Sequence, residues 1–190
     1  MDNEKGYLRR TGVMYFGKPI VAESADSGAY VTSVAISTLT GGVLTIAAQP
    51  DYPRTVRGYL TDANASITNA TVTIVGVDQN GVGISDTLTF TAAGAQTTVK
   101  AFAHVTSATW ALVSGTVTDT SDTISLGAGA SLGLPADPGA IYEKLVKATF
   151  DGGDDAGTFS KTYGLYVPAG TMNGAKEVLV VYNYKVQIPN

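Results

Sequence analysis

The sequence predicts an all-β protein: an antiparallel β-sandwich or jelly-roll-like body with an extended N-terminal arm. Three observations lead to this prediction. Short segments alternate apolar and polar residues with period two, they recur at intervals of roughly 8 to 12 residues, and Gly-, Asn- and Asp-rich breaks separate them. We find no helix-period segment long enough for an α/β fold and no internal repeat.

The clearest element is a hairpin in residues 71–90, which read TVTIVGVDQNGVGISDTLTF. Thr71–Ile74 and Thr87–Phe90 alternate threonines with apolar residues. One face of each strand is therefore predicted to be buried, and the other to carry hydroxyl groups. Residues 78–81 between them are Asp, Gln, Asn and Gly, which tolerate the positive φ angles of a tight turn.

The remaining elements follow in order along the chain. Residues 30–38 and 43–48 flank Gly41 and Gly42 and are predicted to pair as a hairpin. Further strands are expected at 52–60, 97–105, 108–117, 122–129, 158–168 and 176–188. The last of these is apolar enough to be central in its sheet. Residues 131–140 contain two prolines and are predicted to form a long loop, whereas residues 140–150 fit either a short helix or a strand.

We divide the chain into an extended N-terminal arm, residues 1–28, and a β-sandwich body, residues 29–190. The arm mixes charged residues and glycines with apolar and aromatic ones, and a disordered tail would contain few of the latter. It is therefore expected to pack against its own body or against a neighbouring molecule.

Low charge and many hydroxyl groups characterise the chain. Charged residues make up 15% of it, whereas soluble domains carry about 25%. Thr, Ser, Asn and Gly must therefore supply most of the surface polarity. The formal net charge is -4, and Lys100 is the only basic residue between Gly58 and Glu143. No surface in that region can follow a phosphate backbone, so we expect no nucleic-acid partner.

The sequence also bears on the compartment. It contains no cysteine, and hence no disulfide or thiolate metal site. The opening MDNEKGYLRR lacks the apolar core of a signal peptide, and no apolar run approaches the roughly 18 residues of a membrane span. We expect synthesis in a cytoplasm and no membrane partner.

Candidate catalytic and metal-binding groups are few. His104 is the only histidine, and no cysteine exists to join it in a reactive set, so we expect a strand residue with a hydrogen-bond partner. Asp151, Asp154 and Asp155 form an oxygen-rich loop of the kind that Ca²⁺ favours, but they lack EF-hand spacing. We expect a turn there, with no metal, no cofactor and no enzymatic activity. Trp110 is expected in the core.

Residues 53–110 contain three linked motifs: a Pro-Arg strand start, a hairpin of the form TVTxxGxDxNG, and a strand of the form TxVxxFxxVxS. The matching residues are Pro53, Arg54, Thr71–Gly76, Asp78, Asn80, Gly81, Ile84, Asp86–Thr89, Phe102, Val105 and Ser107. Together they resemble a segment that recurs in structural proteins of tailed bacteriophages. The residues before and after it match no family pattern.

The resemblance implies a virion component, in the first place a capsid decoration (cement) protein. Such a protein binds the outer surface of a phage head lattice and stabilises it by non-covalent contacts. The implied partners are the major capsid protein and further copies of the chain, with a trimer favoured because it suits local three-fold positions. The implied location is the capsid surface of the virion, after synthesis in the host cytoplasm.

We place the capsid contacts in the N-terminal arm. Aromatic and arginine side chains usually contribute most of the binding energy of an interface. The candidates are such residues and the adjacent leucine: Tyr7, Leu8, Arg9, Arg10, Tyr15 and Phe16. Arg9 and Arg10 are expected to pair with acidic capsid residues, and the apolar side chains to fill pockets between capsomers. The alternative interpretation is that the aromatic residues complete the core of their own chain.

Three other functions remain open. A different virion part, such as a tail tube, tail tip or head-fibre base, uses similar β modules. A cell-surface adhesin-type module is disfavoured by the missing signal peptide. A carbohydrate-binding β-sandwich module would be supported by exposed aromatic residues in a groove with a Ca²⁺ loop.

Overall fold

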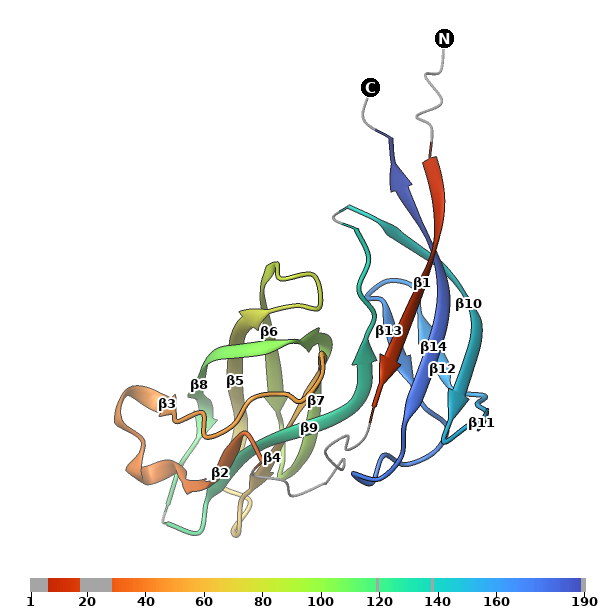
Figure 1. The fold of residues 1–190 in the computed structure, drawn as a ribbon. Coiled ribbons are helices and arrows are strands. Elements are labelled where there is room, and N and C mark those ends of the chain that lie inside the picture. Colours follow the sequence, from red (N-terminus) through yellow and green to blue (C-terminus); the bar gives the residue numbers. More distant parts are fainter. Residues whose placement is uncertain (1–6, 18–28, 119, 138, 189–190) are drawn as a thin grey trace.

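The computed structural model describes residues 7–17, 29–118, 120–137 and 139–188. Within these ranges the fold is all-β, as the sequence predicts, and consists of strands β1 to β14 with two short 3-10 helices, η1 and η2. The strands form three antiparallel sheets (Figure 1). They are arranged in two lobes. From here on, the body means only the sandwich of two sheets described next, and the C-terminal lobe means the part built on the third sheet.

The body is a sandwich of two sheets. One sheet has the order β3-β8-β5-β6, with β3 at Val43–Leu44, β8 at His104–Gly115, β5 at Ile67–Val77 and β6 at Gly83–Phe90. The facing sheet contains β2 (Val31–Ala35), β9 (Thr123–Gly133), β4 (Arg54–Thr61) and β7 (Gly94–Phe102). Apolar side chains from both sheets, among them Val72, Phe90, Leu60 and Leu126, form one buried core.

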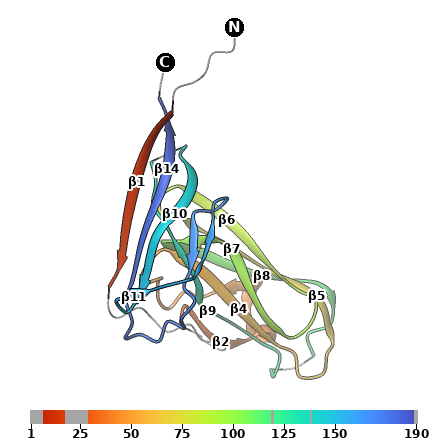
Figure 2. The ribbon, with the colours of Figure 1, turned by 90° about the vertical axis from the view of Figure 1, so that its right-hand side faces the viewer.

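The C-terminal lobe contains the third sheet, of order β1-β14-β10-β11. Its strands are β1 (Tyr7–Phe16), β14 (Val178–Gln187), β10 (Ile141–Phe150) and β11 (Gly153–Asp154). Two short strands, β12 (Thr158–Ser160) and β13 (Leu165–Val167), extend the second body sheet beyond β9. A second core joins these strands to the third sheet and includes Phe16, Val180, Tyr182 and Tyr166. Figure 2 shows β1, β14 and β10 of the third sheet side by side.

Strand β9 belongs to both lobes. Its first part pairs with β2, its pairing with β4 extends as far as Leu132, and its last two residues, Leu132 and Gly133, pair with β13. Accordingly, Leu126 lies in the body core and Leu132 in the second core. One continuous strand therefore joins the two cores (Figure 1).

The predicted hairpin of residues 71–90 is confirmed. Strands β5 and β6 pair antiparallel, and Thr73 lies opposite Thr87. In the turn, the carboxylate of Asp78 accepts a hydrogen bond of 2.8 Å from the amide of Asn80, and Gly81 has a φ of 77°. As predicted, the Asp and Gly residues of the turn are there for the backbone: Asp78 binds a backbone amide and Gly81 adopts a positive φ angle.

The predicted hairpin around Gly41 and Gly42 is wrong. Strand β2 pairs with β9 and β3 pairs with β8, so the two strands belong to opposite sheets of the body. Between them, η1 (Ile36–Thr38) and η2 (Thr40–Gly42) carry the chain from one sheet to the other. Both glycines have positive φ, 60° and 71°. They serve a crossing between sheets and not a tight hairpin turn.

Residues 140–150, which fitted either a helix or a strand, form strand β10. Its register against β14 shifts twice, at Glu143 and at Val146. Each irregularity inserts one residue, so the inward-facing side chains of Tyr142, Leu145 and Ala148 are spaced by three positions instead of two. A spacing of three is also what one face of a helix shows, which explains the ambiguity.

Two further expectations concern the C-terminal lobe. The strand predicted at 176–188 is central, because β14 lies between β1 and β10. The loop predicted at 131–140 begins later than expected, because β9 continues through Gly133 to complete its pairing with β13.

Residues 7–16 of the predicted arm form β1, which pairs with β14 from Tyr7 opposite Gln187 to Phe16 opposite Val178. Gly12 permits this pairing, because a Cβ at that position would lie 2.4 Å from the ring of Tyr182. Residues 1–6 and 18–28 lie outside the described ranges, so the domain boundary at residue 28 stays a prediction.

Candidate interaction surface

The candidate interaction surface is the side of the β1-β14-β10 sheet that faces away from the core, and we call it the β1 face. Alternation along β1 defines it: Phe16 points into the second core, and its neighbour Tyr15 points away. Val13 and Tyr15 are 63% and 56% exposed. They lie opposite Val181 and Leu179 of β14, so one end of the β1 face is apolar.

The other end of the β1 face is charged. Glu143 of β10 accepts a hydrogen bond of 2.7 Å from Nε of Arg9, and its second oxygen lies 2.9 Å from Nζ of Lys185. Lys185, and then Arg9, lower the pKa of Glu143 below its ordinary value. This cluster joins the three main strands of the sheet, because each residue comes from a different one.

Acid is expected to weaken the Glu143 cluster. Since the folded-state pKa of Glu143 is lowered, its contribution to stability is complete above the ordinary pKa of 4.5 and is lost as the pH falls through the folded-state value. Unfolding should be measured for the wild type and for Glu143→Gln between neutral pH and about pH 3. The wild type should be the more stable at neutral pH, and the difference should shrink in acid; a constant difference would contradict the ion-pair role.

Basic side chains outnumber acidic ones on the β1 face. The basic ones are Arg9, Lys144, Lys147 and Lys185, and the acidic ones among its described residues are Glu143, Asp154 and Glu177, which accepts a hydrogen bond from Tyr15. Lys147 lies 3.5 Å from Asp154, which leaves the face with a surplus of positive charge. The chain as a whole has a net charge of -4. The β1 face is therefore opposite in sign to the rest of the protein.

Five of the six predicted contact residues are exposed on β1, and three of these five are apolar or aromatic. Tyr7 and Leu8 are 50% and 47% exposed, and Tyr15 is more exposed than either. The hydroxyl of Tyr15 donates a hydrogen bond of 2.6 Å to Glu177, and this bond raises the pKa of Tyr15. The bond holds the ring in place on the β1 face.

The other three predicted contact residues have partners in their own chain. Arg9 pairs with Glu143, and Arg10 lies 2.7 Å from a carboxylate oxygen of Asp137. Phe16 is fully buried in the second core and lies edge-to-face against the ring of Tyr52. For Phe16 the alternative interpretation therefore applies: this residue completes the core of its own chain and offers no surface to a partner.

Sequence reasoning missed Val13 on β1 and the lysines of β10. The signal for Val13 was present, because it and Tyr15 are two residues apart and share one face of a strand. No such signal existed for Lys144 and Lys147, because their place beside β1 depends on the pairing of both strands with β14.

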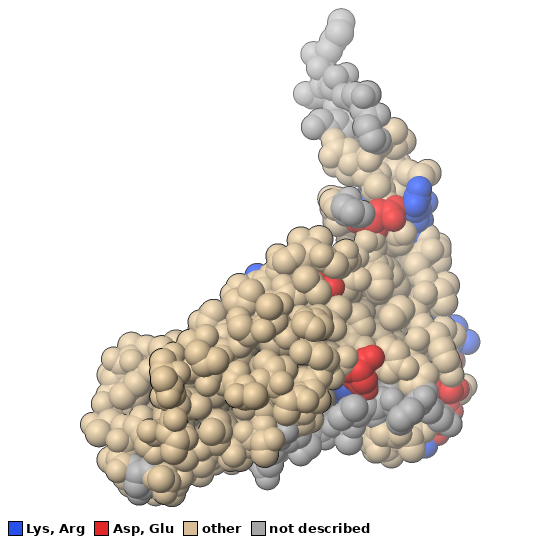
Figure 3. Space-filling view, turned by 60° about the vertical axis from the view of Figure 1, so that its left-hand side comes forward, with Lys and Arg blue, Asp and Glu red and all other residues tan. Residues whose placement is uncertain are grey.

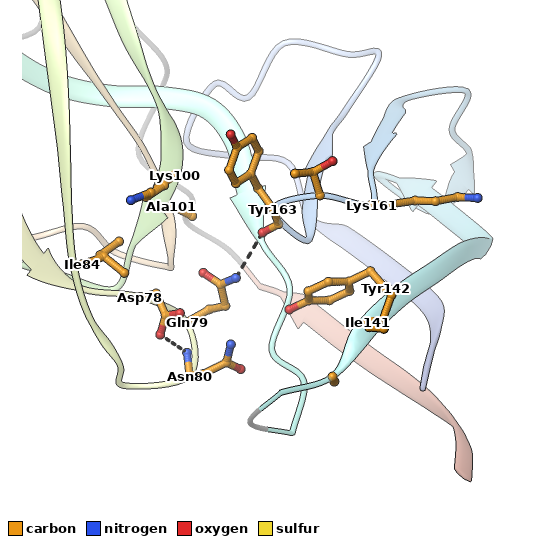
Figure 4. Close-up of a pocket in the computed structure, with 12 residues that line it drawn as sticks. Asp78, Gln79, Asn80, Ile84, Lys100, Ala101, Ile141, Tyr142, Lys161 and Tyr163 are labelled. Atoms are coloured by element: carbon orange, nitrogen blue, oxygen red, sulfur yellow. Dashed lines mark hydrogen bonds between the residues drawn. The ribbon is translucent and has the colours of Figure 1, made fainter. Parts of the chain in front are cut away.

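A pocket of about 430 Å³ lies between the body and the C-terminal lobe (Figure 4). Gln79 of the β5–β6 turn donates a hydrogen bond of 3.4 Å to the carbonyl of Tyr163, and the side-chain oxygen of Asn80 accepts one of 2.8 Å from the amide of Ala136. These bonds cross from one lobe to the other. The polar groups of the pocket thus hold the lobes together, and we regard the pocket as their junction.

The candidate catalytic and sugar-binding side chains do not converge on this pocket. His104 is exposed at the start of β8. Trp110 is 6% exposed and lies in the body core, as predicted, so its ring is not available to stack on a sugar.

The aspartates of the predicted Asp-Gly turn have separate partners. Asp151 pairs with Lys176, and Asp155 accepts a hydrogen bond of 2.6 Å from the hydroxyl of Tyr166. Asp154 pairs with a lysine of β10. The residues that the structure describes contain no group of three or more side chains placed to hold a metal ion.

Comparison with protein-family models, with curated proteins and with solved structures gives no match for this chain. No helix in the described part of the chain is long and apolar enough to cross a membrane.

Proposed function

We propose that the protein is a capsid decoration protein of a tailed phage, made in the host cytoplasm. It binds the major capsid protein on the outside of the head and stabilises the lattice by non-covalent contacts. The observation that carries this proposal is the β1 face, where Val13 and Tyr15 are more than half exposed at one end and the cluster of Arg9, Glu143 and Lys185 lies at the other. The phage assignment comes from the resemblance of residues 53–110.

The β1 face suits attachment because its geometry is already fixed. Ten residues of β1 are held in register by β14, and the Glu143 cluster ties β10 to both strands. Side chains that are ordered before binding lose less conformational entropy when a partner covers them. Aromatic and arginine side chains also contribute most strongly to interfaces. Tyr15 and Arg9 supply these two types here.

The charge of the β1 face indicates the chemistry of the partner surface. Lys144 and Lys147 are exposed, and Asp154 compensates only one of them. An acidic patch on the major capsid protein would therefore be attracted to this side of the chain, although the chain is acidic overall. Many copies on a symmetric lattice reinforce one another, so each contact needs only modest strength.

The function is tested by the copy number per virion, measured by quantitative mass spectrometry against the major capsid protein. A ratio near one, or a fixed fraction such as one third, is expected for a protein that decorates the lattice. A ratio of a few hundredths would place the protein in the tail, at the portal vertex or in a fibre. That result would replace capsid decoration by another virion role.

The β1 face is tested by Val13→Asp. A carboxylate at this exposed position repels an acidic partner and leaves an unpaired charge in the interface, so affinity for undecorated heads should fall by at least about tenfold. The matched control is Val99→Asp on β7, where the valine is 51% exposed on the body. Co-sedimentation with purified heads measures both variants. Equal binding of the two variants would remove the β1 face from the proposal.

A further inference from the structure

A second surface, on the body, consists of small uncharged side chains in register. On the outer side of the β6-β5-β8 sheet, cross-strand pairing produces three rows: Thr89, Thr71, Ala111; Thr87, Thr73, Thr109; and Ser85, Val75, Ser107. We call these rows the threonine face. Val72 and Ile74, between them on β5, point the other way into the body core.

The threonine face contains no charged side chain. The charged residue of β6, Asp86, turns its carboxylate toward β7, where it accepts hydrogen bonds from the amides of Val99 at 2.7 Å and Lys100 at 3.1 Å. Figure 3 shows the same contrast on a larger scale: few charged side chains appear over the body, and most of them gather over the C-terminal lobe. Two copies of this acidic chain can therefore approach through the threonine face without repulsion there.

Within strands β6, β5 and β8 the threonine face is also nearly symmetric about β5, while β3 adds Val43 beside Thr109 on the β8 side alone. Ser85 and Ser107 flank Val75 on either side, and Thr87 and Thr109 flank Thr73. If a second sheet is turned over about an axis along β5, β6 of one copy comes to lie over β8 of the other. In the rows of Thr73 and Val75 each serine then meets a serine and each threonine a threonine, whereas Thr89 meets Ala111 in the third row. Two of the three rows are thus self-complementary, as a two-fold contact requires.

We propose that the threonine face binds a second copy of this chain, with a two-fold axis along β5 that passes beside Thr73. Hydroxyl groups can donate and accept, so matched threonine and serine rows form hydrogen bonds between the copies. Val75, which is 40% exposed, packs against its own counterpart. This contact does not use the β1 face, so it holds or fails independently of the capsid contact.

The size of the face determines how tight the contact is. With strands about 4.8 Å apart and a same-face repeat of about 6.8 Å, the three rows cover roughly 300 Å². Stable complexes bury about 800 Å² per partner. The pairing is therefore a weak, concentration-dependent equilibrium in solution, and neighbouring positions on a lattice would strengthen it through avidity.

The test is sedimentation equilibrium of the full-length chain from about 10 μM to about 1 mM, the range over which weak pairing becomes populated. The weight-average mass of the wild type should rise from that of the 19.5 kDa monomer toward that of a dimer. Thr73→Lys places like charges against each other at the axis, so its association should be at least about tenfold weaker. Thr97→Lys, at an exposed threonine on β7, should associate like the wild type.

A mixture of two variants tests the position of the axis. Thr73→Lys and Thr73→Glu should each stay monomeric alone and should associate when they are mixed, because opposite charges then meet at the axis. The proposal is overturned if the wild type stays monomeric at the highest concentration or forms a trimer. It is also overturned if Thr97→Lys weakens association as much as Thr73→Lys, or if mixing restores nothing. Circular dichroism verifies that each variant is folded.

Discussion

Arg54→Ala is expected to lower the free energy of unfolding by about 3–5 kcal/mol, the range for breaking a buried charge pair. Arg54 is fully buried at the start of β4. Its Nε donates a hydrogen bond of 2.9 Å to the carbonyl of Gly129, its Nη1 donates one of 3.2 Å to Asp51, and its Nη2 lies 4.0 Å from the sulfur of Met172. Alanine removes these contacts together and leaves a cavity.

The effect should be large because Arg54 lies between the two lobes. Gly129 belongs to β9, and Met172 belongs to the second core. Arg54→Lys should recover only part of the loss, because a single ammonium group cannot reach the partners that the planar guanidinium fork reaches together. Urea denaturation measures both variants.

The control for Arg54→Ala is Arg10→Ala. The ion pair between Arg10 and Asp137 is shorter, at 2.7 Å, but the two side chains are 49% and 38% exposed. An exposed pair of this kind contributes at most about 1 kcal/mol. If the two alanine variants lose equal stability, burial does not determine the role of Arg54 and the explanation fails.

Phe16→Ala should lower the free energy of unfolding much more than Tyr15→Ala does, although the residues are adjacent. Phe16 is fully buried in the second core, and its truncation should lower the free energy of unfolding by about 3–5 kcal/mol. Tyr15 points away from that core and loses an exposed hydrogen bond to Glu177, so its truncation should cost about 1 kcal/mol or less. Thermal and chemical denaturation measure these losses.

Capsid binding should show the reverse order for the same pair. At a temperature where both variants are folded, Tyr15→Ala should bind undecorated heads more weakly than the wild type, and Phe16→Ala should bind like it. If Phe16→Ala weakens binding and Tyr15→Ala does not, the face of β1 that contacts the capsid has been assigned wrongly.

Sequence predicts those parts of this fold that depend on local pattern. The β5–β6 hairpin is one, because period-two alternation, turn residues and pairing partners all lie within residues 71–90. Strand β14 is another, because a long apolar run with alternation indicates a central strand.

The parts that sequence does not predict depend on distant pairing. Strands β2 and β3 are neighbours in sequence, yet each finds its partner in a different sheet. The burial of Arg54 depends on Gly129 and Met172, and nothing near Arg54 in sequence indicates it. The apolar half of the β1 face is readable from alternation, whereas its lysines come from β10 through the shared partner β14.

The pairing of β1 with β14 has a consequence for the order of folding. On the ribosome, β1 is made first among the described strands and β14 last. The two strands are partners, and Phe16 of β1 pairs with Val178 of β14. At about 5–20 residues per second, the roughly 160 intervening residues take some 10–30 s to synthesise. The β5–β6–β8 segment can pair within that time, because its partners are close in sequence. The C-terminal lobe, and with it the β1 face, is therefore completed only after translation of β14.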